Sequence, residues 1–103
     1  MITNHQEFIN CIHALTKGTI TYYSKKDKQN TTRTIAPVDY GPHARYPQKG
    51  NLYLFFDFEG TDQAHHTGKS AEEIVSFAPL AEKFLPSDVP KQQAPYSIPR
   101  DWG

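Results

Sequence analysis

The chain has 103 residues, which is room for one domain rather than two. Its 11 Lys and Arg residues balance its 11 Asp and Glu residues, so no overall basic field directs it to nucleic acid or to an anionic membrane. Aromatic residues make up 13% of a chain whose net charge is zero, which argues against intrinsic disorder. These values predict a small folded domain with a thin core.

The cellular location is predicted by elimination. A single cysteine excludes an internal disulfide, so an oxidising compartment is not needed. The first residues, Met1 to His5, lack the basic and apolar regions of a signal peptide. The longest apolar run, Leu52 to Phe56, is far shorter than the ~20 residues of a membrane-spanning helix. We therefore expect a cytoplasmic protein.

Residues 3–16 are expected to form a helix, because apolar residues recur there at helical spacing. The members of this apolar stripe are Phe8, Ile9, Ile12 and Leu15. Thr3 and Gln6 have the form of a capping box, and Gly18 stands where a left-handed residue often ends a helix. A helix of about four turns is not stable alone, so the stripe must pack against something.

β-Branched and aromatic residues predict strands over 19–23 and 31–36, joined as a hairpin by the polar run 24–30. Pro37 indicates that the second strand ends, or lies at an edge, near that position. The stretch 41–50 holds two Pro and two Gly residues and is therefore interpreted as a loop.

The clearest strand is 51–58, which is apolar on both faces and is therefore expected to lie inside the sheet. Three short elements are predicted to follow it: a return strand over 63–67, one helical turn over 70–73 and a strand over 74–77. Residues 80–85 are expected to form a short helical segment that holds Phe84 against the sheet.

The composition changes near the C-terminus, where four of the eight prolines lie in the last 18 residues. Because each proline removes a donor and restricts its predecessor, this tail should be extended. We predict a single α+β domain over residues 1–86 and a Pro-rich extended tail over 87–103. The domain is expected to have its N-terminal helix packed on a small, strongly bent, mostly antiparallel sheet of about four to five strands. An open sheet with the helix on one face is the alternative.

No pattern in the sequence predicts catalysis, so we expect a protein that is not an enzyme. Cys11 and His13 are two residues apart on the helix and face different directions, so Cys11 is expected to be a buried structural thiol. Adjacent strand residues such as His65 and His66 face opposite sides. Since no zinc-ligand spacing occurs either, neither a metal site nor a cofactor is expected.

Asp57 and Glu59 are two residues apart, as paired acid and base groups can be. They precede Gly60 at the end of a strand, however, and are therefore expected to be solvated charges.

Charge is unevenly distributed along the chain. Residues 17–49 carry seven Lys and Arg against two Asp, whereas residues 50–90 carry two Lys against seven acidic residues. The basic segment also contains aromatic side chains that suit base stacking: Tyr22, Tyr23, Tyr40 and Tyr46. One interpretation is contact with phosphates and bases, and the other is a solvated set of loops that offsets the acidic half of the domain.

Three segments, in this order after a short helix, are similar to those of a known family: Ile20-Thr21-Tyr22, Arg33-Thr34-Ile35-Ala36-Pro37 and Leu52-Tyr53-Leu54. The chain resembles the WYL domain, an Sm-like, SH3-type small barrel of bacterial transcription regulators. In this resemblance Arg33 and Pro37 match an R-x-x-x-P element, and Tyr22 matches a tyrosine of the first strand. Tyr53 and Leu54 match the last two residues of the Trp-Tyr-Leu motif that names the family. The sequence departs from the family at Leu52, which replaces the tryptophan of that motif, and at Glu73, which stands where the family has a ligand-facing arginine. We expect no helix-turn-helix before the domain, which is a further departure from the family.

The resemblance implies a stand-alone bacterial regulatory module that binds a ligand, with nucleotides or single-stranded nucleic acid as the ligand class. The expected contact residues are Arg33, Tyr22 and Tyr53, because the arginine offers a planar donor fork and each tyrosine offers a ring and a hydroxyl. The alternative is a protein–protein interaction module in which Trp102 of the tail anchors in a partner's groove. In a third interpretation, Trp102 folds back over the core of its own domain.

Overall fold

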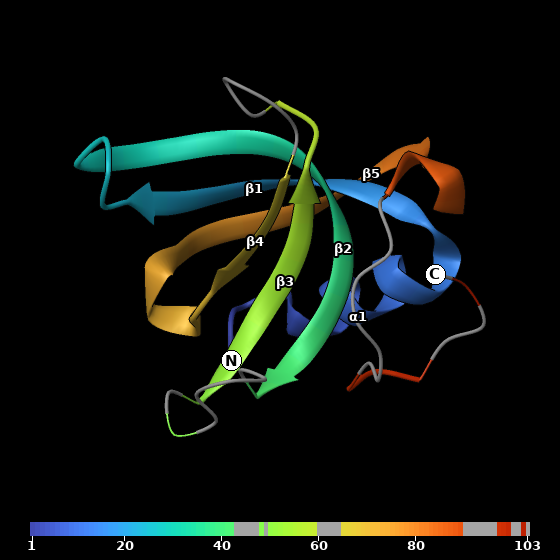
Figure 1. Ribbon diagram of the computed structural model, residues 1–103, viewed down its shortest axis with the longest axis horizontal. Coiled ribbons are helices and arrows are strands. Elements are labelled where there is room, and N and C mark those ends of the chain that lie inside the picture. The colour runs from blue at the N-terminus through green and yellow to red at the C-terminus, as the bar shows by residue number, and fades with distance from the viewer. Residues whose placement is uncertain (43–47, 49, 60–64, 90–96, 100–101, 103) are drawn as a thin grey trace.

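One helix packs on a five-stranded antiparallel sheet in the computed structural model, which describes residues 1–42, 48, 50–59, 65–89, 97–99 and 102 (Figure 1). The elements are α1 (His5–Ala14), β1 (Thr16–Ser24), β2 (Gln29–Pro42), β3 (Asn51–Asp57), β4 (His65–Lys69), the 3-10 turn η2 (Ala71–Glu73), β5 (Ile74–Lys83) and the 3-10 turn η3 (Pro86–Asp88). The strand order is β4-β3-β2-β1-β5. The predicted α+β class is confirmed, and the sheet is open, with β4 and β5 at its edges.

Helix α1 buries the apolar stripe that its spacing predicted, with Phe8 and Ile12 fully inside. The predicted capping box is wrong. Asn4 precedes the helix, and its Nδ2 donates to the carbonyl of Phe77 at 2.6 Å instead of capping α1. The left-handed residue after the helix is Leu15, with φ 57°, and β1 begins at the next residue, Thr16, before Gly18 is reached.

Gly18 therefore lies inside β1 rather than at the end of the helix. A Cβ at this position would overlap the ring of Phe77 on the neighbouring strand β5. The glycine is required by this close approach of a ring to the backbone, and not by a left-handed conformation.

The predicted hairpin is confirmed, with β1 and β2 paired from Gly18 opposite Ile35 to Ser24 opposite Gln29. The expectation that the strand ends near Pro37 is wrong, because β2 continues to Pro42. Pairing with β3 begins at Ile35, where pairing with β1 stops. Pro37 thus lies at a local edge, which was the other half of the prediction, and its missing N–H breaks no bond to β1.

Strand β3 has neighbours on both sides, as its apolar faces predicted. The expected helical segment over 80–85 is wrong, because β5 extends to Lys83 and pairs with Thr16. Phe84 is nevertheless buried, and its N–H donates to the carbonyl of Leu15 at 2.9 Å. The predicted loop 41–50 lies largely outside the described residues, as does much of the tail.

Two apolar clusters lie on opposite faces of the sheet. The face covered by α1, called the inner face below, carries Ile20, Ile35, Tyr53 and Phe55, and none of these is exposed. The smaller cluster on the other face is formed by Ala36, Val38, Phe56, Phe84 and Val89. The helix covers only part of the inner face, which leaves its remaining end for polar side chains.

Candidate ligand-binding site

Strand register brings Tyr22, Arg33 and Asp57 together at the end of the inner face that lies away from α1. Arg33 is opposite Ile20 on β1, so it shares a face with Tyr22, two residues further along that strand. Asp57 is opposite Ile35 on β2 and shares the same face. Two of the three ligand-contact residues predicted from the sequence, Tyr22 and Arg33, therefore belong to one cluster.

The centre of this cluster is an ion pair between Nε of Arg33 and Oδ2 of Asp57, which are 3.5 Å apart. The Arg33 side chain is 24% exposed, while that of Asp57 is only 2% exposed. Nε is buried and makes no hydrogen bond to any residue in the described part of the chain. The guanidinium is thus held by charge, with donor capacity that the described residues do not fully use.

The prediction that Asp57 is a solvated charge is wrong. Asp57 Oδ1 accepts the N–H of Glu59 at 2.8 Å, and its other oxygen faces Arg33. A buried carboxylate is tolerated only when it is paired and hydrogen-bonded, and both conditions are met here. Glu59 is exposed as expected, and its Oε2 accepts the N–H of Thr34 at 2.8 Å.

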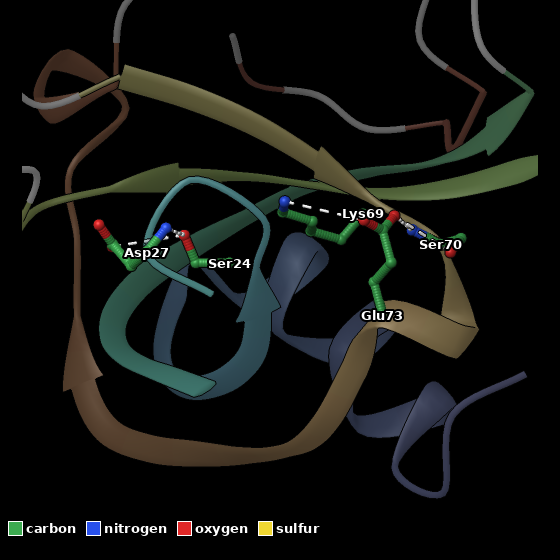
Figure 2. Close-up of polar contacts among 5 residues, drawn as sticks. All are labelled: Ser24, Asp27, Lys69, Ser70 and Glu73. Carbon is green, nitrogen blue, oxygen red and sulfur yellow. Dashed lines mark hydrogen bonds and ion pairs between the residues drawn. The ribbon is translucent and has the colours of Figure 1, made fainter. Parts of the chain in front are cut away.

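A second basic side chain approaches from β4, because Nζ of Lys69 lies 5.0 Å from the centre of the Tyr22 ring. The same Nζ is 3.9 Å from Oε2 of Glu73, whose Oε1 accepts the N–H of Ser70 at 3.1 Å. Figure 2 shows Lys69, Ser70 and Glu73 together at the end of β4. The same view contains the turn of the β1–β2 hairpin, where Ser24 and Asp27 are labelled. The cluster is therefore flanked by one further cation and one further carboxylate.

The turn of the β1–β2 hairpin carries three lysines of the basic segment that the sequence predicted. Lys25, Lys26 and Lys28 are exposed, and Ser24 accepts the N–H of Asp27 at 3.2 Å to close the turn. Arg45 and Lys49 of the same segment, with Tyr46, lie outside the described residues.

The electrostatics of Tyr22 and Glu73 follow from these neighbours. Burial and the nearby Asp57 raise the pKa of Tyr22 above its usual value of 10.0, and Arg33 opposes that rise. Burial also raises the pKa of Glu73, but the hydrogen bonds from Ser70 and the charges of Lys69 and Lys25 outweigh it and hold that pKa below 4.5. At neutral pH Tyr22 therefore presents a neutral phenol and Glu73 an ionised carboxylate.

The third predicted contact residue, Tyr53, lies elsewhere on the inner face and is fully buried. Its hydroxyl accepts the N–H of Ile2 at 3.1 Å and is hydrogen-bonded to Nδ1 of His5 at 2.8 Å. Its ring contacts those of Phe8 and Tyr40. The structure places Tyr53 under the N-terminus and α1, and not beside Arg33.

Trp102 lies against the domain. Its indole Nε1 donates to the carbonyl of Ile12 at 2.7 Å, and its ring meets Phe84 edge-on with 5.4 Å between ring centres. This is the arrangement of the third, fold-back interpretation. The predicted burial of Cys11 is confirmed. Burial raises the pKa of its thiol, and the charge of the nearby Glu7 raises it further.

Within the described residues, no three His, Cys, Asp or Glu side chains are grouped as a metal site requires. No helix of the described chain is both long and apolar enough to span a membrane. Comparisons with protein-family models, with curated proteins and with solved structures gave no match.

Sequence reasoning missed Asp57 and Lys69 as members of the site. Asp57 is the last residue of a strand that alternates between two buried faces, so its parity with Tyr53 and Phe55 was a signal that it points inward. The position of Lys69 depends on the pairing of β4 with β3, where Tyr53 is opposite Lys69. No local pattern in the sequence encodes that pairing.

Proposed function

We propose that this chain is a ligand-binding regulatory module resembling a WYL domain, and that its ligand is a nucleotide or a short single-stranded nucleic acid. The observation that carries the proposal is the Arg33 guanidinium, which is partly exposed and paired with a buried carboxylate. Its Nε makes no hydrogen bond to the described residues. A planar fork of donors in this condition suits a phosphate group.

Asp57 has a supporting role in this proposal. A buried carboxylate at 3.5 Å restrains the guanidinium before any ligand arrives, so less side-chain entropy is lost on binding. Asp57 also balances the charge of Arg33, and the ammonium group of Lys69, which is itself 3.9 Å from Glu73, offers further donors to an anion. The neutral hydroxyl of Tyr22 adds a donor beside Arg33.

The finer fold assignment, an Sm-like small barrel, belongs to the same proposal. It is supported by the path of β2, which pairs with β1 through its first half and with β3 through its second half. A strand shared in this way between two halves of a sheet is typical of strongly bent sheets and partly open barrels. The proposed action is binding inside the cytoplasm, without catalysis.

The experiment is an NMR titration of the ¹⁵N-labelled chain with mononucleotides and with short single strands at low salt, where phosphate contacts are strongest. We expect amide shifts to concentrate around Arg33, Tyr22 and Lys69. Arg33→Gln should abolish them, whereas Lys26→Gln, which removes an exposed charge on the hairpin turn, should leave them nearly unchanged.

Flat spectra around Arg33 at millimolar mononucleotide, together with flat spectra for the oligonucleotides, would show that this ligand class is wrong. Equal losses for Arg33→Gln and Lys26→Gln would indicate nonspecific charge attraction rather than a site.

A further inference from the structure

A second buried carboxylate, Asp39, holds the C-terminal tail by its main chain. Asp39 is 5% exposed and lies on the second half of β2. Its Oδ2 accepts the N–H of Ser97 at 3.0 Å, and its Oδ1 accepts the N–H of Ile98 at 2.8 Å and that of Tyr40 at 2.9 Å. Such charge-assisted bonds to successive main-chain N–H groups recognise a bent main chain, here at Ser97 and Ile98, whatever its side chains.

The C-terminal end of α1 provides further polar contacts to the same segment. The carbonyl of Ile12 accepts the indole N–H of Trp102, and Nε2 of His13 donates to the carbonyl of Pro99 at 3.0 Å. Phe84, buried at the end of β5, provides the ring against which Trp102 packs. These contacts combine main-chain bonds with one aromatic anchor, as peptide-recognition sites commonly do.

Gly41 also packs closely against the tail. A Cβ at this position would overlap the side chain of Ser97. This part of β2 lies beyond Ile35, where pairing with β1 ends, so that side of the strand is open to another segment. The residues that contact the tail here are together called the tail groove: Ile12, His13, Asp39, Gly41 and Phe84.

We propose that the tail groove is a peptide-binding site that also accepts residues 97–102 of a second copy of this chain, so that two copies exchange tails. The contacts are the same whichever copy supplies the segment, which is the condition for exchange between identical chains. The tail of the same chain has the advantage of a high effective concentration. Exchange is therefore expected at high protein concentration, or when one chain's own tail is defective.

The test uses the full-length Trp102→Ala variant and a synthetic peptide of residues 96–103. Trp102 is the chain's only tryptophan, so in this mixture all tryptophan fluorescence comes from the peptide. We expect saturable binding with a shift of the emission to shorter wavelength, as the indole leaves water and packs on Phe84.

Two matched controls test the geometry. Adding Asp39→Asn to the Trp102→Ala chain should weaken binding by about tenfold or more, because an amide group would face the peptide N–H donors. A peptide that is N-methylated at the nitrogen of Ile98 keeps every side chain but loses one of these donors, and it should also bind more weakly. Binding that is insensitive to both changes would mean that the peptide attaches elsewhere.

Exchange between copies is tested by mixing two defective full-length chains. The Trp102→Ala chain has an intact groove and a defective tail, whereas the Asp39→Asn chain has an intact tail and a defective groove. Sedimentation velocity should show a heterodimer in the mixture and more monomer in each variant alone. Absence of both peptide binding and heterodimer with folded chains would overturn the proposal.

The proposal is also testable if Trp102→Ala does not fold alone. Recovery of the native circular dichroism spectrum on addition of the peptide would then support it. Failure of the peptide to restore folding would count against it, because the tail would be an inseparable part of the core.

Discussion

Arg33 and Asp57 form an ion pair between neighbouring strands in which the carboxylate is almost completely buried and the guanidinium is about a quarter exposed. The unequal burial matters for energetics. Losing Arg33 leaves a charge in the interior, whereas losing Asp57 leaves a charge that reaches solvent. The pair therefore responds differently to removal of each partner.

We expect Arg33→Gln to lower the free energy of unfolding by about 3 kcal/mol and Asp57→Asn by about 2 kcal/mol, after allowance for solvent screening at Arg33. The double variant should lose less than the sum of the two. Urea denaturation at pH 7 measures all three values. Glu82→Gln is the control, since it breaks an exposed pair with Lys17 and should cost under ~1 kcal/mol. A similar small cost at Asp57 would contradict the role assigned to its burial.

The raised pKa of Tyr22 predicts a loss of stability in alkali. Burial and Asp57 disfavour the phenolate in the folded chain, so the unfolded state releases its proton first as pH rises through about 10. Stability is then complete below the unfolded pKa and is lost as pH rises through the folded one. The stability of Tyr22→Phe should decline less steeply between pH 9 and 11 than that of the parent. Denaturation curves at these pH values test this, and parallel declines would contradict it.

The lowered pKa of Glu73 predicts a loss of stability in acid. Because its folded pKa is lowered below 4.5, the stability that it contributes is present above that value and is lost as pH falls through the folded pKa. Glu73→Gln should be less stable than the parent by about 1 kcal/mol at pH 7, and the difference should shrink in acid. Thermal unfolding at pH 7 and pH 3 measures both. Glu72→Gln, which alters the exposed neighbour, should show no such convergence.

Periodicity predicted much of the fold, because helix α1, the β1–β2 hairpin and β3 are specified by local patterns of burial. The predictions that were wrong, for residues 80–85 and for Pro37, share a different cause. Residues 80–85 have helical composition, yet they form a strand because β1 offers a backbone partner as far as Thr16. Pro37 lies within a strand because only one side of β2 is paired at that point. Both outcomes depend on contacts between distant segments, which no local pattern contains.

Only part of the candidate site was predictable from the sequence. Tyr22 and Arg33 lie on adjacent strands of a hairpin, so the sequence was sufficient to place them near each other. Tyr53 was expected beside them, but β3 is long enough to carry it to the other end of the inner face, while Asp57 on the same strand reaches Arg33. Position along β3, and not only its face, decides which residue joins the cluster.

Gly18 provides a test of packing rather than of backbone conformation. In Gly18→Ala the new methyl group would overlap the Phe77 ring, so β1 or the ring must shift, at a cost of about 1–3 kcal/mol. Combining it with Phe77→Leu should recover part of the loss, because the smaller side chain leaves room. Urea denaturation of the two single variants and the double variant measures this coupling. Strictly additive losses would show that the two residues do not compete for the same space.

Truncation after Pro86 tests how much the tail contributes to stability in the intact chain. It removes the buried Val89 together with Ile98 and Trp102, which pack against the two apolar clusters. It also leaves Asp39 without the N–H groups of Ser97 and Ile98. A loss of about 2–3 kcal/mol would lower the melting temperature of a domain this size by roughly 10 °C or more. Trp102→Phe is the matched control, because it keeps an aromatic ring on Phe84 and removes the bond to the Ile12 carbonyl, for a loss of about 1 kcal/mol. An unchanged melting temperature after truncation would mean that these contacts do not persist in solution.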